Sequence, residues 1–185
     1  MRRVVAVAAG LALAGAAALL LFLSQGVRRA APIIVNHPAW VETKWPFPMD
    51  QWGEGKAFEC RAADCGTDLK LYIRSKIGFC SATTGVADDN ELERLSDFDF
   101  MKGADVAVGI GHEIHVGWMK GRLRAYAGRK NPAASAMSIA YNNDSDALVA
   151  TVLLIKERPD AAEPAIIAFL SGEDMLRWVK VTLGL

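Results

Sequence analysis

The chain has 185 residues, and its 21 Lys and Arg residues balance 21 Asp and Glu residues, so the formal net charge is zero. General nucleic-acid binding needs a basic excess that displaces counterions from phosphates, so this balance argues against that class of protein. We therefore predict no nucleic-acid partner, although the balance still allows a local charged patch. The chain is long enough for a leader followed by one domain with its own hydrophobic core.

The first part of the chain joins a basic start to a long apolar run. Arg2 and Arg3 precede Val4–Leu23, which carries no charged residue and has the length of about 20 residues that a helix needs to cross a bilayer. We predict that residues 1–26 are either a cleaved signal peptide or a single-pass membrane anchor, and both alternatives stay open. In either case residues 27–185 are expected outside the cytoplasm. Frequent alanine suggests a bacterial, hence periplasmic, location.

Residues 27–55 form a lead-in that is rich in tryptophan and proline. Its prolines disfavour a long helix or a central strand. Four aromatic side chains lie close together in this segment: Trp40, Trp45, Phe47 and Trp52. We expect them to hold an extended arm against the core of the domain. The alternative is that they anchor the chain at the level of the lipid headgroups.

Residues 56–185 predict a single α+β domain, with a curved antiparallel sheet of about five to seven strands covered by two main helices. Thr67–Arg74 alternates apolar and polar residues, which is typical of a half-buried strand. Ala147–Ile155 is almost entirely apolar, which predicts a central strand covered on both faces. The other elements that we expect are strands at Ala57–Cys60 and Ala136–Tyr141, a loop at Arg61–Asp64, a helix at Ala87–Met101, a linker at Pro159–Glu163, and a last helix that Ser171 and Asp174 cap.

A cationic hairpin is the strongest binding candidate in the sequence. If Lys120-Gly121 is a turn between Glu113–Met119 and Arg122–Ala127, the alternation of side chains gives both strands a consistent inner and outer face. The outer face, called the hairpin face below, then presents four basic side chains and a tyrosine: His115, Lys120, Arg122, Arg124 and Tyr126. It would suit an anionic ligand or the acidic face of a protein. The alternative is an ordinary solvated strand face without a binding role, whose charges discourage aggregation.

The chain has three cysteines, Cys60, Cys65 and Cys80. Outside the cytoplasm these should form one disulfide and leave one free thiol. A hairpin loop brings its flanks within disulfide range, so we predict Cys60–Cys65 with Cys80 free, and Cys65–Cys80 or Cys60–Cys80 as alternatives. The free thiol is either a buried, inert side chain or the centre of a thiol-dependent reaction.

No motif in the chain predicts a cofactor or a metal. The cysteine spacing does not match the usual zinc pattern. His112 and His115 are three residues apart on an expected strand, so their side chains should point to opposite faces. The glycine patterns for nucleotides and the serine motifs for hydrolysis are missing.

The composition and motifs together favour a protein without catalysis. We expect an exported or membrane-tethered binding or accessory protein of the bacterial cell envelope, which contacts the membrane if its leader is not cleaved. The hairpin face is the expected contact surface. The alternative is a periplasmic thiol-dependent enzyme or redox protein that acts through the unpaired Cys80.

Overall fold

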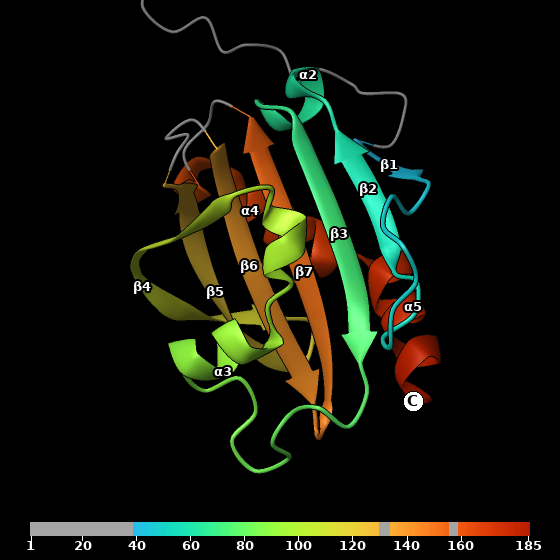
Figure 1. The fold of residues 1–185 in the computed structure, drawn as a ribbon. Helices are drawn as coiled ribbons and strands as arrows, with labels where there is room; N and C mark the ends of the chain where they lie inside the picture. The colour runs from blue at the N-terminus through green and yellow to red at the C-terminus, as the bar shows by residue number, and fades with distance from the viewer. Residues whose placement is uncertain (1–38, 130–133, 156–158) are drawn as a thin grey trace, which may run out of the picture. The chain divides into compact units, whose positions relative to one another are not determined.

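A computed structural model describes residues 39–129, 134–155 and 159–185. The predicted signal or anchor segment, residues 1–26, and the first part of the lead-in lie outside these residues. Within the described part, seven antiparallel strands form one sheet in the order β1-β2-β3-β7-β6-β5-β4 (Figure 1). None of the described helices is long and apolar enough to cross a membrane.

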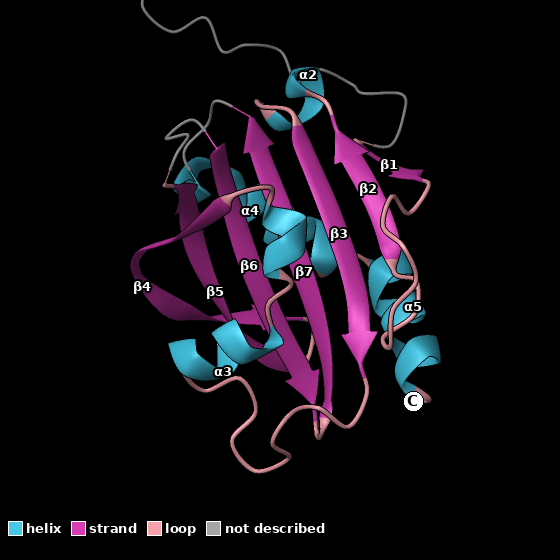
Figure 2. Ribbon diagram, viewed as in Figure 1, coloured by secondary structure: helices cyan, strands magenta, loops and turns pink. Residues whose placement is uncertain are grey.

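The sheet has helices on both faces, which confirms the α+β prediction. Figure 2 shows α4 and α5 behind the sheet and α3 in front of it. The strands are β1 (Trp40–Thr43), β2 (Lys56–Cys60), β3 (Leu69–Lys76), β4 (Ala104–Val116), β5 (Met119–Gly128), β6 (Ala134–Asn143) and β7 (Asp146–Ile155). The helices are α2 (Ala62–Cys65), α3 (Asp89–Leu95), the 3-10 helix η1 (Phe98–Met101), α4 (Pro159–Leu170) and α5 (Glu173–Leu183).

The larger core lies between the sheet and the two C-terminal helices. Alternate residues of the central strands point to this side because strand side chains repeat every two residues. Five helix residues close it from outside, each buried: Ala162, Ile166, Leu170, Met175 and Val179. The strand β7 lies between β3 and β6 and is buried on both faces, as its apolar sequence predicts.

The opposite face of the sheet is covered by the lead-in, α3 and η1. Trp45 is only 8% exposed and packs with Phe47 against Tyr72 and Phe100. The expected clamping of the lead-in onto the core is therefore confirmed for Trp45 and Phe47. The same layer covers the polar side of β3, so the prediction that this strand is half-buried was wrong.

The cationic hairpin forms with a different turn from the one expected. Its strands pair Val116 with Met119 and His115 with Lys120, so the turn is at Gly117-Trp118. The difference in register is an even number of residues, and an even shift leaves each strand side chain on its original face. The faces of the hairpin were therefore predicted correctly apart from Trp118, which lies in the turn, and Met119, which is buried in the larger core.

Four local expectations were wrong for identifiable reasons. The helix expected at Ala87–Met101 breaks at Ser96, whose hydroxyl donates to the Leu92 carbonyl oxygen and meets the Ser138 hydroxyl. The expected loop after Cys60 contains one helical turn, α2. The expected linker belongs to α4, whose first residue is Pro159, a position where a missing N–H costs little. The cap expected from Ser171 does not form, because Gly172 occupies that position.

Candidate functional site

The two arginines of the hairpin face are engaged by α3. The Arg122 side chain pairs with Asp89, and Arg124 pairs with Glu93 at 2.7 Å and with Asp89 at 3.4 Å. Both guanidinium groups also donate to the backbone of β4, at the carbonyl oxygens of Gly109 and Gly111. Each side chain is therefore less than one-fifth exposed. These four charged residues, the α3 ion cluster, hold α3 and the irregular part of β4 against the sheet.

The α3 ion cluster also fixes the charge state of Asp89. Partial burial alone would raise the pKa of its carboxyl group. Hydrogen bonds from Arg122 and from the Gly111 N–H outweigh burial, together with the charges of both arginines, and hold the pKa of Asp89 below its usual value. A lowered carboxyl pKa means that ionised Asp89 stabilises the folded state.

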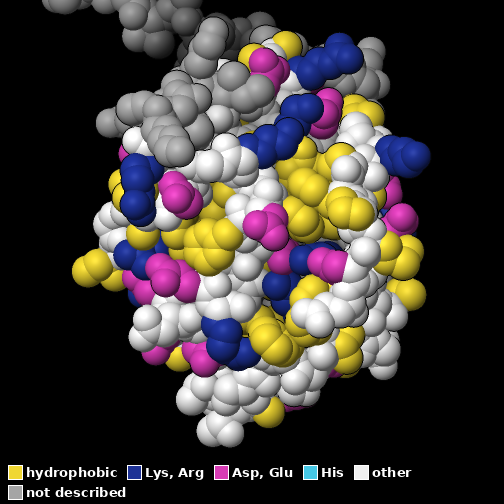
Figure 3. Space-filling view, in the orientation of Figure 1, with side chains coloured by type: hydrophobic (Ala, Val, Ile, Leu, Met, Phe, Trp, Pro, Cys, Tyr) yellow, Lys and Arg dark blue, Asp and Glu magenta, His cyan; other side chains and the backbone are white. Residues whose placement is uncertain are grey.

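The other members of the hairpin face are divided between core and solvent. Tyr126 is 1% exposed, and burial, with a smaller effect of Glu93, raises its pKa to about 12. Lys120 and His115 are exposed, and each lies near Glu113, at 3.3 and 3.9 Å. On the side of the molecule that Figure 3 shows, basic and acidic side chains lie side by side. Anion binding at the hairpin face stays a prediction, with Lys120 as its exposed cation and the exposed His115 beside it.

A second ion cluster lies at the C-terminal end of β3. The Asp97 carboxylate accepts hydrogen bonds from Arg74 and lies 2.9 Å from the Lys76 ammonium, and all three side chains are at most 6% exposed. Arg74 also reaches Asp50, at 2.7 Å. The break between α3 and η1 turns Asp97 towards the sheet, so these buried cations are neutralised. The cluster explains how Arg74, on the side of the strand that alternation predicts to be polar, is buried together with Lys76.

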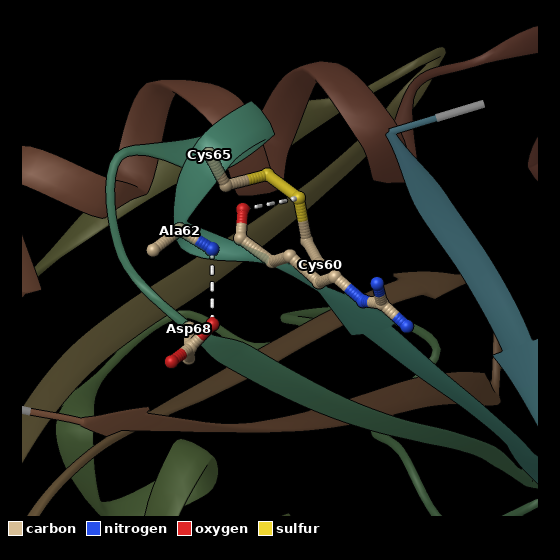
Figure 4. The surroundings of a disulfide bond; sticks show 5 residues. Cys60, Ala62, Cys65 and Asp68 are labelled. Carbon is tan, nitrogen blue, oxygen red and sulfur yellow. Dashed lines mark hydrogen bonds between the residues drawn. A yellow bond between two sulfur atoms is a disulfide. The ribbon is translucent and has the colours of Figure 1, made fainter. Parts of the chain in front are cut away.

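The cysteine prediction is confirmed by the structure. Cys60 and Cys65 form a disulfide with 6.1 Å between their Cα atoms, and Asp68 supports the loop by accepting a bond from the Ala62 N–H (Figure 4). Cys80 is free and buried. Burial, and secondarily Glu91, raises the pKa of its thiol, which lowers the thiolate fraction. A buried thiol with a raised pKa is expected to be inert rather than nucleophilic.

Cys80 is also far from the disulfide. Cys60 pairs with Leu69 at the start of β3, whereas Cys80 follows the end of that strand and donates its backbone N–H to Ser145. The eight residues of β3 span roughly 25 Å at the usual rise of a strand. Within one folded chain the thiol therefore cannot exchange with the disulfide.

A concave surface, a groove, lies at the other edge of the sheet. It has a volume of about 410 Å³ and lies between the β1–β2 edge of the sheet and the α4–α5 corner. Four of its lining side chains are aromatic: Trp40, Phe58, Phe169 and Trp178. Ligand sites in proteins are typically apolar clefts of this size with a few polar groups. We call this surface the aromatic groove.

Contacts between aromatic rings shape the groove. Trp40 stacks on Phe169 with 4.5 Å between ring centroids, and Phe58 meets the same ring edge-on at 4.9 Å. Met175, which is 5% exposed, also lines the groove and belongs to the larger core. Because this core fixes Met175 and the rings fix one another, the groove is a preformed apolar surface.

Three charged side chains line the aromatic groove. Glu42 of β1 and Lys56 of β2 form an ion pair at 2.6 Å, and Asp174 lies in the first turn of α5. Two carboxylates against one ammonium leave the lining with a negative excess. An apolar groove with a few charges of this kind can bind and orient a ligand, but it places no nucleophile next to a base.

The sequence did not identify the aromatic groove, because its parts are distant along the chain. Trp40 and Trp178 lie 138 positions apart in the sequence, and they line one groove only because α4 and α5 pack on the sheet. The available signal was the aromatic content of the lead-in, which was interpreted as a clamp on the core. That interpretation holds for Trp45 and Phe47, and also for Trp40, which packs against the larger core and lines the groove as well.

Comparison with protein-family models, curated proteins and solved structures found no match for this chain. Among the described residues, no group of three or more His, Cys, Asp and Glu side chains could hold a metal ion. His112 and His115 lie on opposite faces of β4, as expected, and His112 pairs with Glu163 of α4 at 2.8 Å.

Proposed function

We propose that this protein is a non-catalytic binding or accessory protein of the bacterial cell envelope, and that it holds its ligand in the aromatic groove. The observation that carries the proposal is the preformed cleft of about 410 Å³ with four aromatic side chains. Aromatic residues dominate binding energy at recognition sites because they bury a large area at low entropic cost. The hairpin face is a weaker choice, because α3 engages both of its arginines.

The proposed location outside the cytoplasm has two supports. The Cys60–Cys65 disulfide is consistent with an oxidising compartment, because cytosolic proteins rarely keep such bonds. The apolar run that follows Arg2 and Arg3 is the sequence expected of an export or anchor segment. A thiol-dependent reaction at Cys80, the alternative function, receives less support because that thiol is buried with a raised pKa.

A neutral apolar dye tests the groove. N-phenyl-1-naphthylamine is titrated into the full-length chain, and its fluorescence is compared for the wild type, Trp178→Ala and Trp118→Ala. Trp178 lines the groove, whereas Trp118 is 44% exposed at the β4–β5 turn and provides a matched control. We expect Trp178→Ala to weaken saturable binding at least about tenfold, in the range of a binding hot spot. Equal affinity in all three proteins would contradict the proposal.

A further inference from the structure

The aromatic groove opens beside a strand that has one partner. The strand β1 has four residues and pairs with β2 through all of them, and in the described part of the chain no strand pairs with its other side. An edge strand presents a row of backbone N–H and C=O groups that another extended chain can bind. A ligand in the groove therefore meets both apolar rings and a free strand edge.

The side chains of β1 alternate between the groove and the opposite side. Trp40 and Glu42 line the groove, while Val41 lies between them and is 54% exposed. A chain added beside β1 would follow the same alternation, because strand side chains repeat every two residues. Every second side chain of that chain would then enter the aromatic groove. Binding of this kind takes its affinity from the backbone and its specificity from the groove.

The free edge and the charge of the groove select the chemistry of the occupant. Only a polypeptide supplies alternating N–H and C=O groups at the spacing of a strand, which a lipid or a glycan does not. The excess of carboxylates, Glu42 and Asp174 against Lys56, favours a basic side chain beside the apolar one. Lys56 is already neutralised by Glu42, so Asp174 is the charge left for the ligand on the groove side. Arg177 shares Asp174 at 3.1 Å, in a pair whose side chains are both mostly exposed and therefore easily rearranged.

We infer that the aromatic groove and the free edge of β1 together bind an extended peptide as an added strand, with an apolar side chain in the groove and a basic residue next to it. The inference rests on the proposed function and makes it specific. The peptide segment needs at least the four residues that match the length of β1.

Selection from a random peptide library tests the inference. The full-length chain is immobilised and a phage-displayed heptapeptide library is selected on it. The strongest peptides are then synthesised in three forms, with ordinary backbone amides and with each of the two alternating sets of amides N-methylated. We expect enriched peptides that alternate apolar residues and contain Lys or Arg, and at least a tenfold loss of affinity when the methylated positions face β1. Only one of the two methylation patterns should weaken binding. Successive backbone N–H groups of a strand point alternately to its two sides, and only one side of the added strand faces β1.

Two variants assign the peptide to the groove. Trp178→Ala should lower the affinity for the peptide at least tenfold, and Trp118→Ala should leave that affinity unchanged. Asp174→Asn removes the carboxylate that is left for the ligand, from a side chain that is 94% exposed, and should weaken the binding of peptides that carry Lys or Arg more than it weakens the binding of the neutral dye. This variant keeps the test valid if loss of Trp178 disturbs the packing of α5.

The outcomes separate this inference from the proposed function. If the dye binds in the groove but no peptide is enriched, or if N-methylated peptides bind as well as the originals, the peptide inference is wrong and groove binding stands. If neither the dye nor any peptide depends on Trp178, both are wrong. Enriched peptides whose affinity depends on Trp178 and on one methylation pattern would support both.

Discussion

The α3 ion cluster and the aromatic groove lie at opposite edges of one sheet, and they use their side chains differently. In the α3 ion cluster, every charged group has a partner of opposite charge within the protein, and the two arginines are largely covered. In the aromatic groove, the rings pack on one another yet leave a cleft of about 410 Å³. A residue's availability for binding is therefore decided by what the rest of the chain brings next to it, and less by its own chemistry.

If this contrast is correct, removing paired charges should change stability, whereas removing groove residues should change binding. The largest effect is expected at the C-terminal end of β3. Replacing Asp97 with Ala leaves Arg74 and Lys76 buried without their main carboxylate, and a broken buried ion pair typically costs about 3–5 kcal/mol. Urea unfolding measures the free energy. Asp99→Ala, at an exposed neighbour, should stay within about 0.5 kcal/mol of the wild type. A loss at Asp97 no larger than at Asp99 would contradict the structural role.

The disulfide should give the next largest effect. Replacing both Cys60 and Cys65 with Ala removes a short covalent loop and should lower the free energy of unfolding by about 2 kcal/mol. The measurement is urea unfolding of the variant beside the wild type without reductant. The matched control is Cys80→Ala, which removes a buried thiol without changing the loop. A protein that unfolds at the same urea concentration without the disulfide would show that the loop is held by other contacts.

The α3 ion cluster predicts a dependence of stability on pH. Because the folded-state pKa of Asp89 lies below the unfolded value near 3.9, its ionised form stabilises the protein above that value, and this contribution is lost as pH falls through the folded pKa. Asp89→Asn should lower the free energy of unfolding by about 1–2 kcal/mol at pH 7, since the carboxylate accepts charged hydrogen bonds at a partly exposed site. The difference between the two proteins should shrink in acid. A difference that is the same at pH 7 and pH 3 would contradict this account.

The smallest effect is expected at the tip of the hairpin. Lys120 and Glu113 form an exposed pair at 3.3 Å, and exposed pairs contribute about 0–1 kcal/mol. Lys120→Ala and His115→Ala should each change the free energy of unfolding by less than about 0.5 kcal/mol. Either substitution is therefore suitable for testing an anionic ligand of the hairpin face without disturbing the fold. A loss above about 1 kcal/mol would show that the tip is not a solvated surface.

The sequence predicted elements wherever periodicity and turn chemistry acted locally. The apolar run of Ala147–Ile155 predicted a central strand, and β7 indeed lies between β3 and β6 in the sheet. The hairpin faces were predicted even though its turn was misplaced, because an even shift preserves side-chain direction. The disulfide was predicted for a similar local reason, since its cysteines flank one short loop.

The sequence could not predict contacts between distant segments. Alternation over Thr67–Arg74 placed Arg74 on the polar side of a half-buried strand, but the break after α3 brings Asp97 onto Arg74 and Lys76. Arg122 and Arg124 looked like a binding surface because their partners, Asp89 and Glu93, lie on a helix some 30 residues earlier in the sequence. The aromatic groove depends in the same way on the approach of α5 to β1. Contacts of this kind arise from tertiary packing, and the periodicity of a single sequence does not show which distant segments pack together.

The most direct test of the central claim is one NMR titration of the five tryptophan indole N–H signals with N-phenyl-1-naphthylamine. Each signal is assigned by substituting one tryptophan at a time in the full-length chain. The account predicts that Trp40 and Trp178, which line the aromatic groove, shift and saturate together, while Trp45, Trp52 and Trp118 stay in place. Shifts confined to Trp118, beside the hairpin face, would contradict the claim that the groove is the binding site.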